Sequence, residues 1–192
     1  MEFRIATAAD APGIHEIYAP VVRTSPASFE TTPPDVAEIA RRVENVLARY
    51  PWLVAVEGDR VLAYVYGTEH RARAAYRWSV EVSAYVHADA RRRGLATGLY
   101  RVLFRLLARQ RYARAFAGIT LPNDASVALH ESLGFRKVGV YSRIGHKLGA
   151  WHDVGWWERD LATPSAGDPE EPIPFATYRT EPDVARELAR RD

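Results

Sequence analysis

The stretch DARRRGLATGLYRVLFRLLARQ, residues 89–110, decides how the rest of the chain is interpreted. Three arginines precede Gly94, and the leucines that follow recur at helical spacing, so the stretch predicts a turn that opens an amphipathic helix. The preceding VSAYV, residues 82–86, predicts a strand. Such a turn leaves free N–H groups at the positive end of the helix dipole, and Gly94 has no Cβ to obstruct a ligand. The pattern favours a pyrophosphate site, although a solvated basic turn would use the same residues.

The composition narrows the class of protein. The chain has 192 residues, 47% of them apolar, with a net charge of +2 and no cysteine. It is therefore long enough for one well-packed domain. Its net charge is too small to attract nucleic acid by itself, and without cysteine it can form neither disulfides nor thiolate metal sites. We see no signal peptide and no bilayer-spanning apolar run, and we expect a cytoplasmic protein without membrane partners.

Periodicity and turn residues predict the other elements. We expect helices at 10–22 and 35–50 and a helix from Asp124 that stops at Gly134. We expect strands at 2–8, 76–86, 112–121, 136–141 and 146–160, and a hairpin at 52–67 that turns at residues 57–60. A proline-rich loop separates the first two helices. Residues 162–192 are rich in proline and acid, and predict an extended tail with a possible short helix at its end. The chain thus divides into a domain of residues 1–161 and a tail of residues 162–192.

Several blocks of the sequence resemble one enzyme family. The spacing Arg91-x-x-Gly94-x-Ala96 resembles the acetyl-coenzyme A signature of the Gcn5-related N-acetyltransferases (GNAT), and residues 121–135, LPNDASVALHESLGF, resemble the family's next motif. Together with residues 49–55, 72–86 and 147–157, they closely resemble the phosphinothricin and methionine sulfoximine acetyltransferases. The resemblance implies an α/β (α+β) fold, with a central mixed, mostly antiparallel sheet of about seven strands flanked by helices.

The resemblance also implies which residues hold acetyl-coenzyme A (acetyl-CoA). The pantetheine arm would bond the main chain of the strand at 84–86, the pyrophosphate would lie in the turn at 91–97, and Asn123 would bond the arm near the thioester. The implied residues are Ala84, Tyr85, Val86, Arg91, Arg92, Arg93, Gly94, Leu95, Ala96, Thr97, Asn123 and Ser126. The sequence alone, without the resemblance, favours an ordinary core strand at residues 84–86.

Glu81 is the predicted general base. An amine attacks a thioester through its neutral lone pair, so a carboxylate must remove the ammonium proton directly or through water. Glu81 lies among Trp78, Val80 and Val82, and this apolar setting would raise its pKa toward a useful value. The alternative is a strand glutamate that faces solvent.

The proton donor for the leaving thiolate is left open between two residues. His130 lies seven residues after Asn123, where many members of the superfamily have a tyrosine, and it titrates near neutral pH. It is equally a helix histidine with local hydrogen bonds. Tyr141 is the second candidate acid. Because no cysteine can carry the acetyl group, we expect direct attack through a tetrahedral intermediate.

The resemblance implies an amino-acid-like acceptor that carries anionic groups. Arg71, Arg73 and Tyr76 match its cationic and aromatic contacts, and Phe29 matches a lid residue. A guanidinium can bind a carboxylate or phosphinate with two hydrogen bonds. Trp151, His152 and Trp156 would form the last strand and a subunit contact, which favours a homodimer. We expect no metal, because two adjacent ligands are a weak site.

Two other functions remain open. The same fold could acetylate a protein N-terminus or a polyamine. Alternatively, the chain could be a non-catalytic acetyl-CoA sensor or a nucleic-acid module that uses Arg91–Arg93, Arg101, Arg105, Arg109, Arg111 and Arg114. The aromatic residues near these arginines form no clear stacking platform, so we expect no nucleic-acid partner.

Overall fold

The computed structural model describes residues 1–163 and 167–190. Its centre is a seven-stranded sheet in the order β1-β2-β3-β4-β5-β7-β6. The strands are β1 Glu2–Ile5, β2 Trp52–Glu57, β3 Arg60–Glu69, β4 Ser79–Val86, β5 Arg114–Leu121, β6 Arg136–Lys147 and β7 Ala150–Asp160. Among the strand pairs of the described residues, only β4 and β5 run parallel. The predicted mixed, mostly antiparallel sheet is confirmed.

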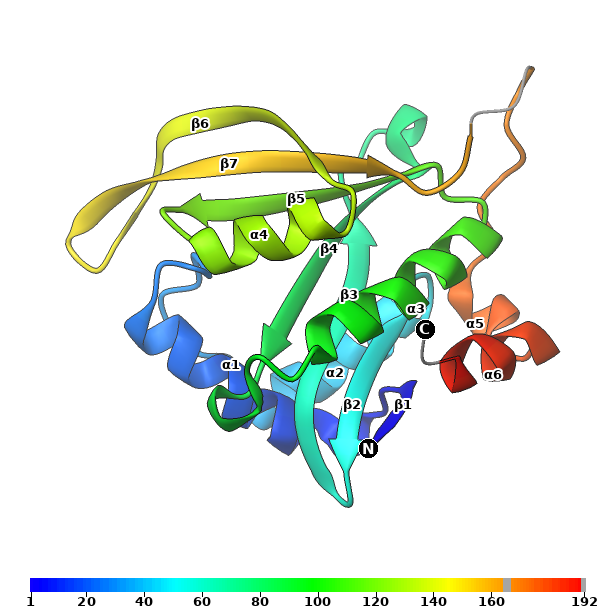
Figure 1. The fold of residues 1–192 in the computed structure, drawn as a ribbon, viewed down its shortest axis with the longest axis horizontal. Helices are drawn as coiled ribbons and strands as arrows, with labels where there is room; N and C mark the ends of the chain where they lie inside the picture. Colours follow the sequence, from blue (N-terminus) through cyan, green and yellow to red (C-terminus); the bar gives the residue numbers. More distant parts are fainter. Residues whose placement is uncertain (164–166, 191–192) are drawn as a thin grey trace.

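Helices cover both faces of the sheet. They are α1 Ala11–Thr24, α2 Val36–Leu47, α3 Leu95–Arg109, α4 Asp124–Ser132, α5 Phe175–Tyr178 and α6 Pro182–Ala189. α1 and α2 lie on one face, and α3 and α4 lie on the other (Figure 1). Polar residues fix two of the helix starts: the side chains of Asp35 and Asn123 accept hydrogen bonds from the amides of Glu38 and Ser126.

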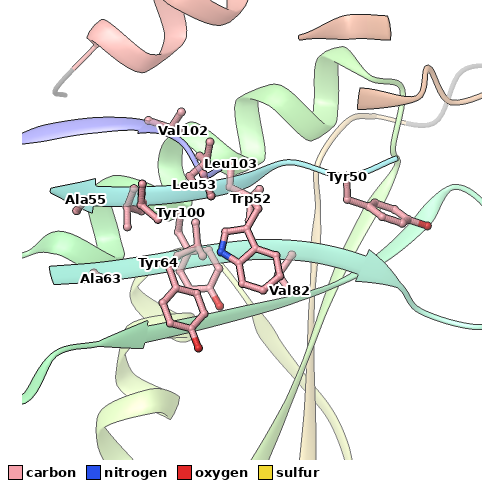
Figure 2. Packing of buried hydrophobic residues seen from close by; sticks show 14 of the residues in the cluster. Tyr50, Trp52, Leu53, Ala55, Ala63, Tyr64, Val82, Tyr100, Val102 and Leu103 are labelled. Carbon is pink, nitrogen blue, oxygen red and sulfur yellow. The ribbon is translucent and has the colours of Figure 1, made fainter. Parts of the chain in front are cut away.

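The core lies between the sheet and the helices on each face. Figure 2 shows Leu53 of β2 close to Val102 and Leu103 of α3, and all three are almost completely buried. Each such side chain contributes about 1.5–3 kcal/mol through burial. On the opposite face, Trp52 stacks on Tyr66 with ring centroids 4.2 Å apart. β2 is therefore packed on both faces of the sheet.

Several element ends differ from the sequence predictions. The second helix ends at Leu47 rather than residue 50, and the first continues to Thr24. β4 begins at Ser79 rather than residue 76, because residues 74–76 form a tight 3-10 turn in which the Tyr76 amide donates to the Arg73 carbonyl. β6 continues past residue 141 because its register shifts there, and the Arg143 amide bonds the Asp153 side chain at 2.7 Å.

The C-terminal segment packs against the domain. The short helix predicted at its end is present as α6, whereas an extended tail does not describe residues 175–178, which form α5. Phe175, Tyr178 and Val184 are buried, and the Glu187 carboxylate meets the Arg105 guanidinium at 2.5 Å. α5 and α6 lie beside α3 (Figure 1). The sequence missed this docking because its apolar residues are few and separated by prolines. Residues 164–166 and 191–192 of the predicted tail lie outside the described residues.

Candidate active site

The parallel strands β4 and β5 separate to form a cleft. They pair only from Ser79–Arg114 to Glu81–Phe116. Beyond this point the strands diverge, and a cleft of about 560 Å³ opens between them, walled also by α1, α3 and α4. A pocket of this size is ordinary for a small-molecule or cofactor site.

The backbone of β4 presents hydrogen-bonding groups to this cleft. The His87 amide donates to the Leu62 carbonyl of β3, whereas the Trp78 carbonyl accepts from the Ala113 amide on the β5 side. Because main-chain groups alternate along a strand, those of Ala84 and Val86 face the cleft. The main-chain groups of Tyr85 point toward β3, so its predicted main-chain contact with the pantetheine arm does not fit this register.

The turn before α3 lies at one end of the cleft. Gly94 has φ +73°, a left-handed conformation that costs other residues energy. The Gly98 amide is the first to bond within the helix, to the Gly94 carbonyl at 3.0 Å. The amides of residues 95–97 thus have no intrahelical acceptor. Arg91 and Ala96 line the cleft.

Two other residues of the turn point elsewhere. Arg93 pairs with Glu57 at 3.2 Å, which directs its guanidinium toward the β2–β3 hairpin. Arg92 is exposed and has φ +60°. The three guanidinium groups of this turn therefore do not converge on one point. Arg92 and Arg93 contribute positive electrostatic potential and main-chain groups.

α4 forms the opposite wall. Asn123, Ser126 and His130 line the cleft, as does Tyr100 of α3. His130 Nδ1 lies 2.8 Å from the Ser126 carbonyl, so Nδ1 carries the proton and Nε2 accepts from the Tyr100 hydroxyl at 3.2 Å. Burial lowers the pKa of His130, while the Ser126 carbonyl opposes this shift. His130 is therefore neutral near pH 7 and has a hydrogen-bond partner at each ring nitrogen.

Glu81 lies where the two strands begin to separate. Its register partner Phe116 lies on the same sheet face, and His70 stacks on Phe116 with a centroid separation of 4.2 Å. Burial raises the pKa of Glu81, and the charge of Arg71 partly offsets this effect. The predicted desolvation is thus present, although 33% of the side chain remains exposed to solvent.

Other predicted residues gather on the Glu81 side of the sheet. Arg71 lies over the Trp156 ring at 5.5 Å, and Tyr141 packs on the same ring at 6.0 Å. Tyr141 does not line the cleft. This location corrects its predicted role as the acid for the thiolate, because it places Tyr141 near the acceptor groups.

The loop that carries Phe29 is tied to the β6–β7 hairpin. Lys147 Nζ donates to the carbonyls of Ser25 and Ser28 at 2.8 and 2.5 Å, and the Phe29 ring lies 6.3 Å from His152. Arg73 and Tyr76 lie on an exposed turn, outside these contacts. The structure thus brings Arg71 toward Glu81 and leaves Arg73 and Tyr76 at the rim.

Sequence reasoning missed His70 and Tyr100 as site residues. Tyr100 lies one helical turn after Ala96, so helical spacing from the glycine turn was a usable signal. No comparable signal marks His70, because its place beside Glu81 depends on the pairing of β3, β4 and β5.

The described residues contain no group of three His, Asp or Glu side chains arranged for a metal ion. In the same part of the chain, no helix has the length and apolar character needed to cross a bilayer.

Comparisons with known proteins agree with this geometry. Residues 3–156 match the acetyltransferase (GNAT) domain. A phosphinothricin N-acetyltransferase from Streptomyces viridochromogenes is 39% identical over 90% of this chain and 94% of its own. An L-methionine sulfoximine/L-methionine sulfone acetyltransferase from Pseudomonas aeruginosa is 34% identical, over 82% of this chain and 93% of its own. The structure of a Sinorhizobium meliloti phosphinothricin acetyltransferase in complex with AcCoA superposes with a TM-score of 0.83, at 35% identity, covering 88% of this chain and 92% of that one.

The chain therefore belongs to the GNAT family of acetyltransferases, and it is an N-acetyltransferase with acetyl-CoA as its acetyl donor. The family and the branch predicted from the sequence blocks are confirmed.

Proposed function

We propose that this enzyme acetylates the α-amino group of a small amino acid or analogue, of the kind represented by phosphinothricin, methionine sulfoximine and methionine sulfone. The observation that carries the proposal is a half-buried carboxylate, Glu81, at the point where an acetyl-CoA cleft meets a cationic and aromatic surface.

The splayed cleft would hold the donor. The free amides of residues 95–97 suit the pyrophosphate, because they point outward at the positive end of α3. Main-chain groups of Ala84 and Val86 would bond the pantetheine arm, which leaves the thioester near Glu81. Asn123 and Ser126 would line the opposite side of the arm.

Glu81 would take the proton from the acceptor ammonium. Its raised pKa makes Glu81 a stronger base than an ordinary glutamate. Because an α-ammonium group has a pKa of about 8, a carboxylate of this kind can deprotonate it at neutral pH. The neutral amine then attacks the thioester carbonyl directly. As the C–S bond breaks, the departing thiolate would take a proton from water, and Glu81 would later return its own proton to solvent. His130 and Tyr100 would lie on the thiolate side of the cleft, where their mutual hydrogen bond holds the Tyr100 hydroxyl.

Arg71 supports an anionic acceptor. Its guanidinium lies over Trp156 and acts on the Glu81 charge, so it can bind a carboxylate or phosphinate beside the reacting amine. A cation at this position would repel a polyamine. Phe29, Arg73 and Tyr76 would complete the contacts when the acceptor is bound.

The arginines of the alternative nucleic-acid face are largely neutralised within the chain. Arg109 pairs with Asp183, Arg111 with Glu170, and Arg114 with Glu158 and Asp160. The acidic C-terminal segment supplies several of these partners. This charge balance argues against a phosphate backbone as the partner.

The β6–β7 hairpin supports a homodimer. Val138, Ile144, Leu148 and Trp151 on this hairpin and its turn are all more than half exposed, with Trp151 at 62%. Exposed apolar clusters of this kind mark protein contacts, and an equivalent hairpin of a second copy is the occupant we propose.

A thiol-release assay with acetyl-CoA tests the proposed activity. Phosphinothricin, methionine sulfoximine, methionine sulfone and free amino acids would be compared as acceptors, with polyamines as the contrast. We expect turnover with the first group, and a loss of about 10²–10⁴-fold in kcat for Glu81→Gln. Glu44→Gln, an exposed carboxylate on α2, is the matched control. Release no faster than background hydrolysis with every amino acid and analogue would overturn the proposal.

A further inference from the structure

His70 lies beside Glu81 but belongs to none of the sequence motifs. It follows the last residue of β3, Glu69. Its ring is stacked on Phe116 with an interplanar angle of 7°, and it meets the edge of Trp156 at 5.6 Å. Two aromatic contacts from two strands fix the plane of the imidazole.

One nitrogen of this ring has an unusual environment. Nδ1 is buried and has no hydrogen-bond partner among the described residues, and Glu81 Oε2 lies 3.7 Å away. A buried polar nitrogen without a partner is costly, so such groups call for an explanation. His70 is held by its neighbours, whereas the partly exposed Glu81 side chain has room to rotate. A movement of less than about 1 Å by the carboxylate would bring the two atoms within hydrogen-bond distance.

We propose that His70 is a positioning residue for the general base: its Nδ1–H donates to Oε2 of ionised Glu81, which leaves Oε1 to receive the proton of the acceptor. This inference rests on the proposed role of Glu81. A simple aromatic filler at this place would need a ring but no nitrogen.

One proton moves in this step. An ammonium N–H bond of the acceptor breaks and an O–H bond forms at Glu81 Oε1, while His70 keeps its single proton throughout. Burial lowers the pKa of His70, and the nearby charge of Arg71 lowers it further, so the imidazole is neutral. A neutral donor orients the carboxylate without the large loss of basicity that an imidazolium would cause.

Other groups around Glu81 cannot replace this donor. The titratable groups that face it are His70 and Arg71, from the segment after β3, and Tyr66 on β3. β5 and β7 contribute the rings of Phe116 and Trp156. Tyr66 pairs with Ser83, and Arg71 lies over Trp156, whereas the imidazole has its Nδ1 3.7 Å from Oε2.

The test compares variants that keep or remove the nitrogen. His70→Phe preserves a stacking ring, His70→Leu removes the donor with a smaller side chain, and His70→Asn retains a donor near the Nδ1 position. The acid limb of kcat/KM against pH reports the pKa of Glu81. Losing one neutral hydrogen bond should move this limb upward by about half to one pH unit in the Phe and Leu variants. In the Phe and Leu variants we expect kcat to fall about tenfold and KM for acetyl-CoA to stay constant. The Asn variant should return the acid limb to its wild-type pH.

A second measurement does not require any acceptor. Carbon-13 NMR titration of the Glu81 carboxyl group should give a higher pKa in His70→Phe than in the wild type, with the Asn variant between them or equal to the wild type. Identical titration curves in the wild type and in both donor-free variants would overturn the inference, as would an unmoved acid limb. The proposed function fails by a different result: the wild type shows no turnover, while the pKa difference of Glu81 between the wild type and His70→Phe is still seen by NMR.

Discussion

Replacing Gly94 with alanine separates the stability of the turn before α3 from its binding role. Gly94 has φ +73°, and beyond the adjacent backbone no atom of the described residues lies within 4 Å of the position that a Cβ would occupy. The left-handed conformation costs an alanine about 1–2 kcal/mol. The smaller entropy of the unfolded alanine chain returns about 0.4–1 kcal/mol. The net loss is thus about 1 kcal/mol, or about 2–4 °C in Tm for a chain of this size.

Gly134→Ala is the matched control. Gly134 follows α4, has φ +84°, and is equally open, because beyond the adjacent backbone no described atom lies within 4 Å of where an alanine Cβ would lie. It does not line the cleft. Both variants should lose the same stability. Only Gly94→Ala should disturb the amides of residues 95–97, and one lost charge-assisted hydrogen bond is worth about 1.5–3 kcal/mol, or about 10- to 100-fold in Kd. Calorimetry with CoA measures this ratio. Equal Kd values for the two variants would refute a phosphate site at this turn.

Two further predictions concern the packing and charge of the domain. Phe175→Ala should cost about 3–5 kcal/mol in the free energy of unfolding, because the ring of this α5 residue is completely buried, whereas Phe29→Ala at an exposed position should cost much less. A small effect of both substitutions in urea unfolding would contradict the docking of the C-terminal segment. Burial alone would raise the pKa of Asp10, but hydrogen bonds from Arg4 and Thr7 outweigh it and lower the pKa. The pair therefore stabilises the fold above the unfolded pKa of about 3.9 and loses this effect as pH falls through the folded value. Asp10→Asn should destabilise by about 1–3 kcal/mol at pH 7 and by much less at pH 3, and a difference independent of pH would speak against it.

Much of the fold was predictable because its signals are local. The leucine stripe of α3, the apolar runs of β2 and β3 and the caps at Asp35 and Asn123 each depend on neighbours within a few residues. Element ends were less predictable. β4 starts late because residues 74–76 form a tight turn that no periodic pattern marks. β6 runs on through a register shift against β7, which depends on the pairing of two strands.

The site was predictable where it depends on the backbone near a motif. The turn at Gly94 and the wall at Asn123 follow from local sequence. The place of His70 beside Glu81 depends instead on three strands meeting, and the docking of Phe175 depends on a surface formed by the folded domain. Neither has a periodic pattern, so sequence reasoning could name the carboxylate but not the imidazole next to it.

The central claim, that main-chain amides at the start of α3 bind the donor's pyrophosphate, has a direct test in backbone amide chemical shifts. Nitrogen-15 spectra of the wild type would be recorded with CoA and with pantetheine, which lacks the pyrophosphate. We predict that CoA shifts the amides of residues 95–97 strongly and that pantetheine leaves them nearly unchanged while perturbing β4. Unaltered amides at 95–97 in the presence of saturating CoA would contradict the account.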